Sequence, residues 1–250
     1  MKKIRTYRTR FKKDIVAEWL LPVKQSNKVL ILCDGLPVVP GKNDLLDFFS
    51  KQGYWVFYPR YRGSWESGGS LLARSPHLDI IDVIDGLFKK IENLHTGQKY
   101  IIKKPKIFLL GSSFGGSAVI LTSQDKRVTA GVAFSPVVDW QAPSQEEPLE
   151  KQYDFLKAVY GMGYRLKKSN WDKLIRGNFY NPIKQVSLID GRKLMIIHSQ
   201  DDKVVRFKDV KKFVKQIGAN FYPLKRGGHL SARLIIQPVW FKKIKKFFKV

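Results

Sequence analysis

Apolar segments of strand length alternate along the chain with stretches in which apolar residues recur at helical spacing. Residues 28–33 (KVLILC) form a nearly continuous apolar run, which is typical of a strand buried on both faces of a sheet. The same reasoning predicts eight strands, at about 4–10, 14–22, 28–33, 54–58, 107–110, 128–134, 193–198 and 219–224. Helical patterns lie between them, around 45–49, from 75, from 114, at 207–217 and at the C-terminus. This alternation predicts a mostly parallel eight-stranded sheet with an N-terminal antiparallel hairpin and helices on both faces.

The helix that begins near residue 75 carries both a start signal and a row of acids. Ser75 and Pro76 suit the N-cap and the first helical position. Asp79, Asp82 and Asp85 follow at spacings of three, which could suggest metal ligands. We interpret them as a solvated helix face that also compensates the helix dipole.

One long segment breaks the strand and helix rhythm. Between residues 137 and 190 no β-α unit fits, and the segment is rich in aromatic and polar residues. Long insertions of this kind usually form lids or binding elements. We therefore predict one domain over residues 1–250 with a cap insertion at 137–190, helical at about 146–160 and 170–176.

The charge is concentrated at the two ends of the chain. The 250 residues include 46 Lys and Arg against 21 Asp and Glu, a net charge of +25. Residues 1–13 carry +7 and residues 203–250 carry +13, which leaves +5 for the 189 residues between them. Such ends could associate weakly with nucleic acid or anionic membranes, but we interpret them as a solvated basic surface, since composition alone does not indicate a nucleic-acid-binding protein.

The C-terminal segment places Trp240, Ile244, Phe247 and Phe248 on one helical face. We expect this face to pack on the sheet with the lysines in water, rather than to lie on a membrane. The single cysteine, Cys33, reads as a small buried apolar residue and requires no oxidising compartment. The basic start lacks an uninterrupted apolar run, and no segment reaches the ~20 apolar residues of a membrane span, so a cytoplasmic protein is expected.

The sharpest chemical signal is the motif G-S-S-F-G at residues 111–115, between a predicted strand and a predicted helix. A serine in the middle of such a turn is held above the strand ends, and its small neighbours let backbone segments approach closely. The N-terminus of the following helix favours developing negative charge. The motif therefore predicts Ser113 as a nucleophile.

Two further features of a Ser-Asp-His hydrolase occur in the expected chain order. Asp201 and Asp202 follow the strand at 193–198, and His229 follows Gly227 and Gly228 after the last strand. Adjacent aspartates leave the register of the acid open. Asp202 is the first choice and Asp201 the alternative.

With these residues in place, the sequence resembles the α/β-hydrolases, and within them the prolyl-oligopeptidase-like and acyl-hydrolase branch. The segment HSQDDKVV at 198–205 is similar to the motif H-G-x-x-D-x-x-V of that family, and aligning the two favours Asp202. The segment at 58–68 (YPRYRGSWESG) resembles a family loop that shapes the site. The resemblance implies an α/β-hydrolase fold over residues 28–135 and 190–240.

The resemblance also places the oxyanion loop at residues 33–37 (CDGLP). It implies that the backbone amides of Leu36 and Phe114 bind the oxyanion. Peptidases of the branch usually carry a tyrosine at the position of Asp34, and many esterases carry a histidine there. We expect the Asp34 carboxylate to turn away and to bond within the loop.

These residues predict a serine hydrolase that cleaves an ester or related acyl bond of a small molecule. Ser113 attacks, His229 transfers the proton and Asp202 orients His229, so that neither a metal nor an organic cofactor is needed. One alternative is a small serine peptidase of the prolyl-oligopeptidase type that takes short peptides. Another is a non-catalytic protein that binds anionic surfaces through its basic ends. The oligomeric state is not predicted.

Overall fold

The apolar runs form one eight-stranded sheet in the computed structural model, which describes residues 6–249. Its strands are β1 (Tyr7–Phe11), β2 (Ile15–Leu20), β3 (Lys28–Cys33), β4 (Trp55–Pro59), β7 (Lys106–Ser112), β8 (Val128–Phe134), β9 (Leu194–Ser199) and β10 (Asn220–Leu224). They lie side by side in the order β1-β2-β4-β3-β7-β8-β9-β10. The pairs from β4 to β10 are parallel, and β1 and β2 form an antiparallel hairpin whose second strand is antiparallel to β4. The predicted sheet is confirmed, except that part of the first predicted strand, residues 4 and 5, lies outside the described residues.

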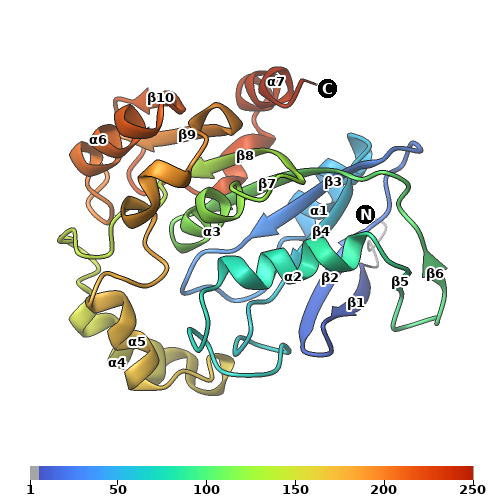
Figure 1. The fold of residues 1–250 in the computed structure, drawn as a ribbon, viewed down its shortest axis with the longest axis horizontal. Coiled ribbons are helices and arrows are strands. Elements are labelled where there is room, and N and C mark those ends of the chain that lie inside the picture. Colours follow the sequence, from blue (N-terminus) through green and yellow to red (C-terminus); the bar gives the residue numbers. More distant parts are fainter. Residues whose placement is uncertain (1–5, 250) are drawn as a thin grey trace.

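Helices cover both faces of this sheet (Figure 1). They are α1 (Asn43–Lys51), α2 (His77–Leu87), α3 (Phe114–Thr122), α4 (Leu149–Tyr160), α5 (Lys168–Ile175), α6 (Phe207–Ile217) and α7 (Pro238–Phe247). Apolar side chains of α2, α3 and α6 pack together on one face, and those of α1 and α7 pack on the other. A short hairpin not expected from the sequence, β5 (Ile91–Glu92) with β6 (Lys99–Tyr100), follows α2.

The register brings the carboxyl ends of the central strands into line. Cys33 pairs with Gly111, Ser112 with Phe134, and Phe134 with Ile197. Because these strands are parallel, the loops that follow them all begin at the same edge of the sheet, where α/β proteins commonly place their ligands.

Helices α4 and α5 lie beyond this edge, in the region predicted to form a cap (Figure 1). The expected helices at 146–160 and 170–176 are observed at Leu149–Tyr160 and Lys168–Ile175. Isolated bridges join this region to the loop after β4, pairing Ser64 with Tyr164 and Leu71 with Leu166. The segment is therefore tied by backbone contacts to the loop after β4.

The C-terminal helix packs as expected. Trp240, Ile244 and Phe248 are buried in the cluster that α7 shares with α1 and the sheet. Since its apolar face is covered, α7 has no free apolar stripe to lay on a membrane. Every helix within residues 6–249 is too short or too polar to span a bilayer.

The helix α2 corrects two expectations. The Ser75 hydroxyl does not cap the backbone, because it lies 2.8 Å from Nδ1 of His77, while Leu78 N donates to the Ser75 carbonyl. Asp79 and Asp82 are buried rather than solvated. The spacing of the acids does not reveal this burial, because the cationic partner that Asp79 and Asp82 share lies 17 residues upstream of Asp79.

That partner is Arg62, in the loop after β4. Its guanidinium bonds Asp79 and lies 2.7 Å from both Asp14 and Asp82, while its backbone amide donates to Asp79 at 2.9 Å. Arg62 is only 15% exposed and Asp79 4%. Bonding to these carboxylates raises the pKa of Arg62, whereas burial raises the pKa of Asp79. The ion pairs therefore fix the loop after β4 against α2.

Loss of the Arg62 guanidinium should destabilise the fold, because the carboxylates with which it pairs are buried. We expect Arg62→Met to lower the free energy of unfolding by about 3 kcal/mol, because it removes the ion-pair partner of the buried Asp79, whereas Asp82 keeps Arg74 at 2.8 Å. Urea unfolding measures the change. Arg192, whose ion pair with Asp190 leaves it 89% exposed, is the matched control, and Arg192→Met should change little. Equal effects of the two substitutions would contradict the structural role of Arg62.

Candidate active site

Ser113 occupies a strained turn between β7 and α3. Its backbone has φ 54° and ψ −122°, a conformation that non-glycine residues rarely adopt. Hydrogen bonds hold the turn, since Ser113 N donates to Phe134 O at 3.0 Å and Gly116 N donates to Ser113 O at 2.9 Å. The side chain therefore stands at the edge of the sheet where the central strands end.

Glycines flank Ser113 because the backbone is too crowded there for a side chain. A Cβ on Gly115 would lie 2.1 Å from the Cys33 carbonyl oxygen, and one on Gly111 would lie 2.6 Å from the Gly115 carbonyl oxygen. Both distances are far inside van der Waals contact. The glycines thus let the start of α3 touch the end of β3, which brings Ser113 beside the loop that contains Leu36.

The two aspartates after β9 have different partners. His229 Nδ1 lies 2.9 Å and 3.2 Å from the two carboxylate oxygens of Asp202. The same carboxylate accepts the amides of Val204 and Val205, both at 2.9 Å. The pKa of Asp202 is lowered because these hydrogen bonds outweigh its burial. A buried carboxylate that stays ionised in this way can hold an imidazole in one orientation.

Asp201 holds the loop that carries His229. Its carboxylate accepts the Ser199 hydroxyl and the amides of Gly228, at 2.9 Å, and Gly227, at 3.3 Å. These hydrogen bonds lower the pKa of Asp201 to about 2. Leu230, on the other side of His229, donates its amide to the Ser135 hydroxyl at 3.0 Å. The histidine is thus fixed from both flanks.

Ser113 and His229 line one cavity without bonding directly. His229 Nε2 is buried and has no hydrogen-bond partner within residues 6–249. An unpaired buried nitrogen is costly in a packed protein and marks a position that serves a purpose other than stability. Hydrogen bonds between a nucleophile and its base are often long before substrate binds.

The amides of Leu36 and Phe114 come from the two loops that meet beside Ser113. Within residues 6–249 neither amide donates a hydrogen bond to another backbone group. Both residues line the larger of two cavities around Ser113. Two free amides close to a serine are the donors that a developing oxyanion requires.

Asp34 bonds within its loop, as expected, although it still lines the smaller cavity. It accepts the Gly35 amide at 3.1 Å and the Tyr58 hydroxyl, and it lies 3.3 Å from the ammonium of Lys42. Burial raises the pKa of the Asp34 carboxyl. Lys42 therefore balances the one negative charge next to Gly35.

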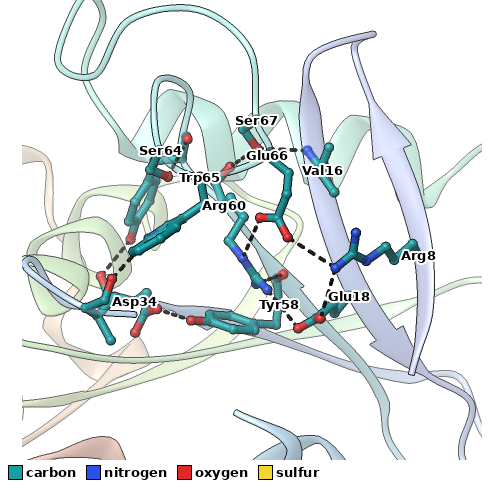
Figure 2. A network of polar contacts seen from close by, with 12 residues as sticks. Arg8, Val16, Glu18, Asp34, Tyr58, Arg60, Ser64, Trp65, Glu66 and Ser67 are labelled. Atoms are coloured by element: carbon teal, nitrogen blue, oxygen red, sulfur yellow. Dashed lines mark hydrogen bonds and ion pairs between the residues drawn. The ribbon is translucent and has the colours of Figure 1, made fainter. Parts of the chain in front are cut away.

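Figure 2 shows how these contacts extend from Asp34 to the N-terminal hairpin. The Arg60 guanidinium stacks on the ring of Tyr58, 4.0 Å from its centroid, and pairs with Glu18 on β2 at 2.7 Å. Arg8 on β1 lies 3.2 Å from Glu66, which in turn lies 3.5 Å from Arg60. The hairpin thus supports the loop after β4, which resembles a family loop expected to shape the site.

Two cavities meet at Ser113. The larger, of about 370 Å³, is lined mainly by the region predicted as a cap, including Trp140, Leu156 and Trp171. The smaller, of about 190 Å³, contains His229. The larger volume is at the lower end of the range typical of small-molecule sites.

The remaining candidates have structural environments. His198 is fully buried, and its Nε2 lies 2.9 Å from the Val205 carbonyl oxygen, which agrees with the expected structural role. Cys33 is buried, and burial raises the pKa of its thiol. Within residues 6–249, no group of three or more His, Cys, Asp or Glu side chains is arranged to hold a metal ion.

Comparison with known proteins identifies the family. The model of the prolyl oligopeptidase family matches residues 43–238, a span that contains Ser113, Asp202 and His229. The chain belongs to the prolyl oligopeptidase family. It is therefore a serine hydrolase with the α/β-hydrolase fold, in agreement with the resemblance noted in its sequence. Membership of this family favours an enzyme over the non-catalytic alternative.

Solved structures similar to this prolyl oligopeptidase family member share its fold at low sequence identity. The Pyrococcus furiosus esterase Pf2001 is 17% identical, with a TM-score of 0.69 over 99% of this chain and 90% of that one. The Pyrococcus horikoshii acylaminoacyl peptidase is 18% identical, with a TM-score of 0.62, and this chain covers only 40% of it. DcsB, solved with a substrate analogue, is 15% identical with a TM-score of 0.71, and 99% of each chain is covered. No curated protein sequence matches this chain.

Several contacts at the site were not predicted from the sequence. Tyr164 exchanges hydrogen bonds of 2.8 Å with the backbone of Val38, 126 positions away, and Trp65, in the loop at 58–68, donates its Nε1 proton to Val38 O at 3.0 Å. Ser135 and Glu147 were not singled out at all. The only available signal was that all four lie in loops that follow strands or in the aromatic insertion.

The contact between Gly115 and Cys33 gives a direct test of the turn. We expect Gly115→Ala to abolish hydrolysis, because the new methyl group must push α3 away from β3 and displace Ser113 from Leu36. Ester hydrolysis and circular dichroism measure the result. Gly41→Ala is the control, since nothing lies within 4 Å of a Cβ there and its φ is not positive. A fully active Gly115→Ala enzyme would contradict the proposed packing.

The role of Asp201 predicts a dependence of stability on acid. Its pKa is depressed in the folded state, so its hydrogen bonds stabilise the fold fully above pH ~4, its unfolded value. The stabilisation should be lost as the pH falls toward about 2. The Tm of the wild type should therefore exceed that of Asp201→Asn at pH 5, and the difference should shrink as the pH is lowered. A difference that is constant with pH would contradict this role.

Proposed function

We propose that this serine hydrolase cleaves carboxylic esters through an acyl-enzyme formed on Ser113. The observation that carries the proposal is the hydrogen-bonded pair of His229 and Asp202, whose free Nε2 belongs to a cavity shared with Ser113. The strained turn that presents Ser113 supports the same assignment.

The proposed reaction uses groups of this chain alone. Ser113 Oγ attacks the acyl carbonyl while its proton passes to His229 Nε2, and the amides of Leu36 and Phe114 bind the oxyanion. The carbon to alkoxide bond then breaks, and His229 gives the proton to the departing alcohol. Water, deprotonated by His229, attacks the acyl-enzyme, and the bond to Ser113 breaks as His229 returns the proton to Ser113 Oγ, which releases the carboxylic acid. Asp202 remains ionised and holds His229 in the required tautomer.

The residue before Gly35 favours an ester over a peptide substrate. Asp34 occupies the position where peptidases of the branch that this sequence resembles usually carry a tyrosine. The esterase Pf2001 is among the solved structures that share the fold. The family name and the peptidase fold support the alternative, a small serine peptidase, which the same residues could serve.

The first test is labelling with a fluorophosphonate, which reacts with activated serines. We expect labelling and p-nitrophenyl butyrate hydrolysis in the wild type, and neither in Ser113→Ala. Because the imidazole would take the wrong tautomer, Asp202→Asn should lower kcat by about 10³ to 10⁴-fold. The matched Asp201→Asn variant should lose less than about tenfold at pH 7, because an amide oxygen still accepts the loop hydrogen bonds.

Three results would overturn parts of the proposal. A folded wild type that does not react with the probe would contradict Ser113 as nucleophile. A larger loss in Asp201→Asn than in Asp202→Asn would reverse the assignment of the acid. Faster turnover of aminoacyl p-nitroanilides than of p-nitrophenyl esters would favour the peptidase.

A further inference from the structure

The larger cavity is acidic in a strongly basic protein. The chain carries a net charge of +25, yet four carboxylates and one cation line this cavity. The carboxylates are Asp139, Glu147, Glu150 and Asp209, and the cation is Arg206. A local excess of carboxylates of this kind favours the binding of a cationic group.

Most of these charges already have partners or face solvent. Arg206 and Asp209 form an ion pair at 2.7 Å. Asp139 accepts hydrogen bonds from Asn181 and from the Gln141 amide. Glu150 is exposed at the rim. Glu147 remains, half-buried and in no ion pair within residues 6–249.

The position of Glu147 links it to the reacting centre. Three residues line both cavities: Leu36, Ser113 and Glu147. The nucleophile, one proposed oxyanion donor and the carboxylate therefore meet where the two cavities join. Lys42, the cation nearest to this junction in the smaller cavity, is occupied by Asp34 at 3.3 Å. Burial raises the pKa of Glu147, as expected of a carboxyl that lacks a fixed counter-ion.

The two cavities differ in which part of a substrate they can hold. His229 lines only the smaller cavity, and the leaving group must reach His229 to receive its proton. The acyl group then occupies the larger cavity, whose walls include Trp140, Leu156, Trp171 and Ile175. An ammonium near the junction would be attached close to the acyl carbonyl.

We infer that Glu147 binds the protonated α-amine of the acyl group, and that the substrates are esters of unblocked amino acids with large apolar side chains. The inference rests on the proposed ester hydrolysis and names its substrate class. The apolar walls bind the side chain, and the Glu147 carboxylate accepts a charge-assisted hydrogen bond from the ammonium. Glu147 is thus a specificity-determining residue.

A competing role for Glu147 is stabilisation of the His229 imidazolium, which would help every substrate equally. The two roles differ in one measurable ratio, that of kcat/KM for an unblocked ester to kcat/KM for its N-acetylated form. A contact with the substrate ammonium raises this ratio, whereas a contact with His229 leaves it unchanged.

The test compares L-phenylalanine methyl ester with N-acetyl-L-phenylalanine methyl ester at pH 6.5, where the α-amine is protonated. We expect the wild type to favour the unblocked ester by about 10- to 100-fold, the range of a hydrogen bond to a charged group. In Glu147→Gln the ratio should fall to near one. Glu146→Gln, which changes the exposed neighbouring carboxylate, should keep the ratio of the wild type.

The outcomes separate this inference from the proposed function. If the wild type shows no preference, or if Glu147→Gln lowers both rates by the same factor, the inference is wrong. Turnover of p-nitrophenyl butyrate and labelling of Ser113 would then still support ester hydrolysis. If the folded wild type hydrolyses none of the esters and does not react with the fluorophosphonate, the proposed function itself fails.

Discussion

The close approach of α3 to the end of β3 is the contact on which the geometry of the site depends. Since the position of a Cβ on Gly115 lies 2.1 Å from the Cys33 carbonyl oxygen, the helix can sit there only with glycine. That approach forces Ser113 into an unfavourable backbone conformation and brings Phe114 beside the loop of Leu36. Strain of this kind persists only where surrounding structure over-determines it, and here the parallel register of β3, β7 and β8 does so.

A second constraint on the site is that the adjacent carboxylates of Asp201 and Asp202 bind different partners. Asp202 is buried and faces His229, whereas Asp201 is exposed and binds the glycines that precede His229. One residue orients the imidazole, and the other fixes the loop that carries it. Two adjacent residues after β9 therefore bond the imidazole of His229 and the backbone amides of the loop that carries it.

Features encoded locally were predictable, and features encoded by distant contacts were not. The eight strands followed from apolar runs, and Ser113 followed from a motif whose strand and helix context is itself local. Asp79 was misread as solvated because its cation, Arg62, lies on another element. Tyr164 meets Val38 across 126 positions. Tyr164 and Glu147 lie outside the two helices of the insertion, so helical spacing could not place them. Sequence spacing fixes which side chains share a face, but not which face meets another.

The basic residues on the outer helices and those that line the cavities at Ser113 have different environments. The lysines of α6 and α7 lie on helices whose apolar faces are buried against the sheet, so that their charge faces solvent. The lysine and the arginine that line the two cavities at Ser113 are neutralised instead, Lys42 by Asp34 and Arg206 by Asp209. An unbalanced cation close to Ser113 would compete with the two backbone amides for the oxyanion and would hold the carboxylate product. In the proposed reaction, pairing each cation leaves the oxyanion to fixed backbone dipoles, which need no reorganisation during the reaction. Within residues 6–249, Glu147 at the junction of the cavities takes part in none of these ion pairs, which is the basis of the substrate preference inferred above.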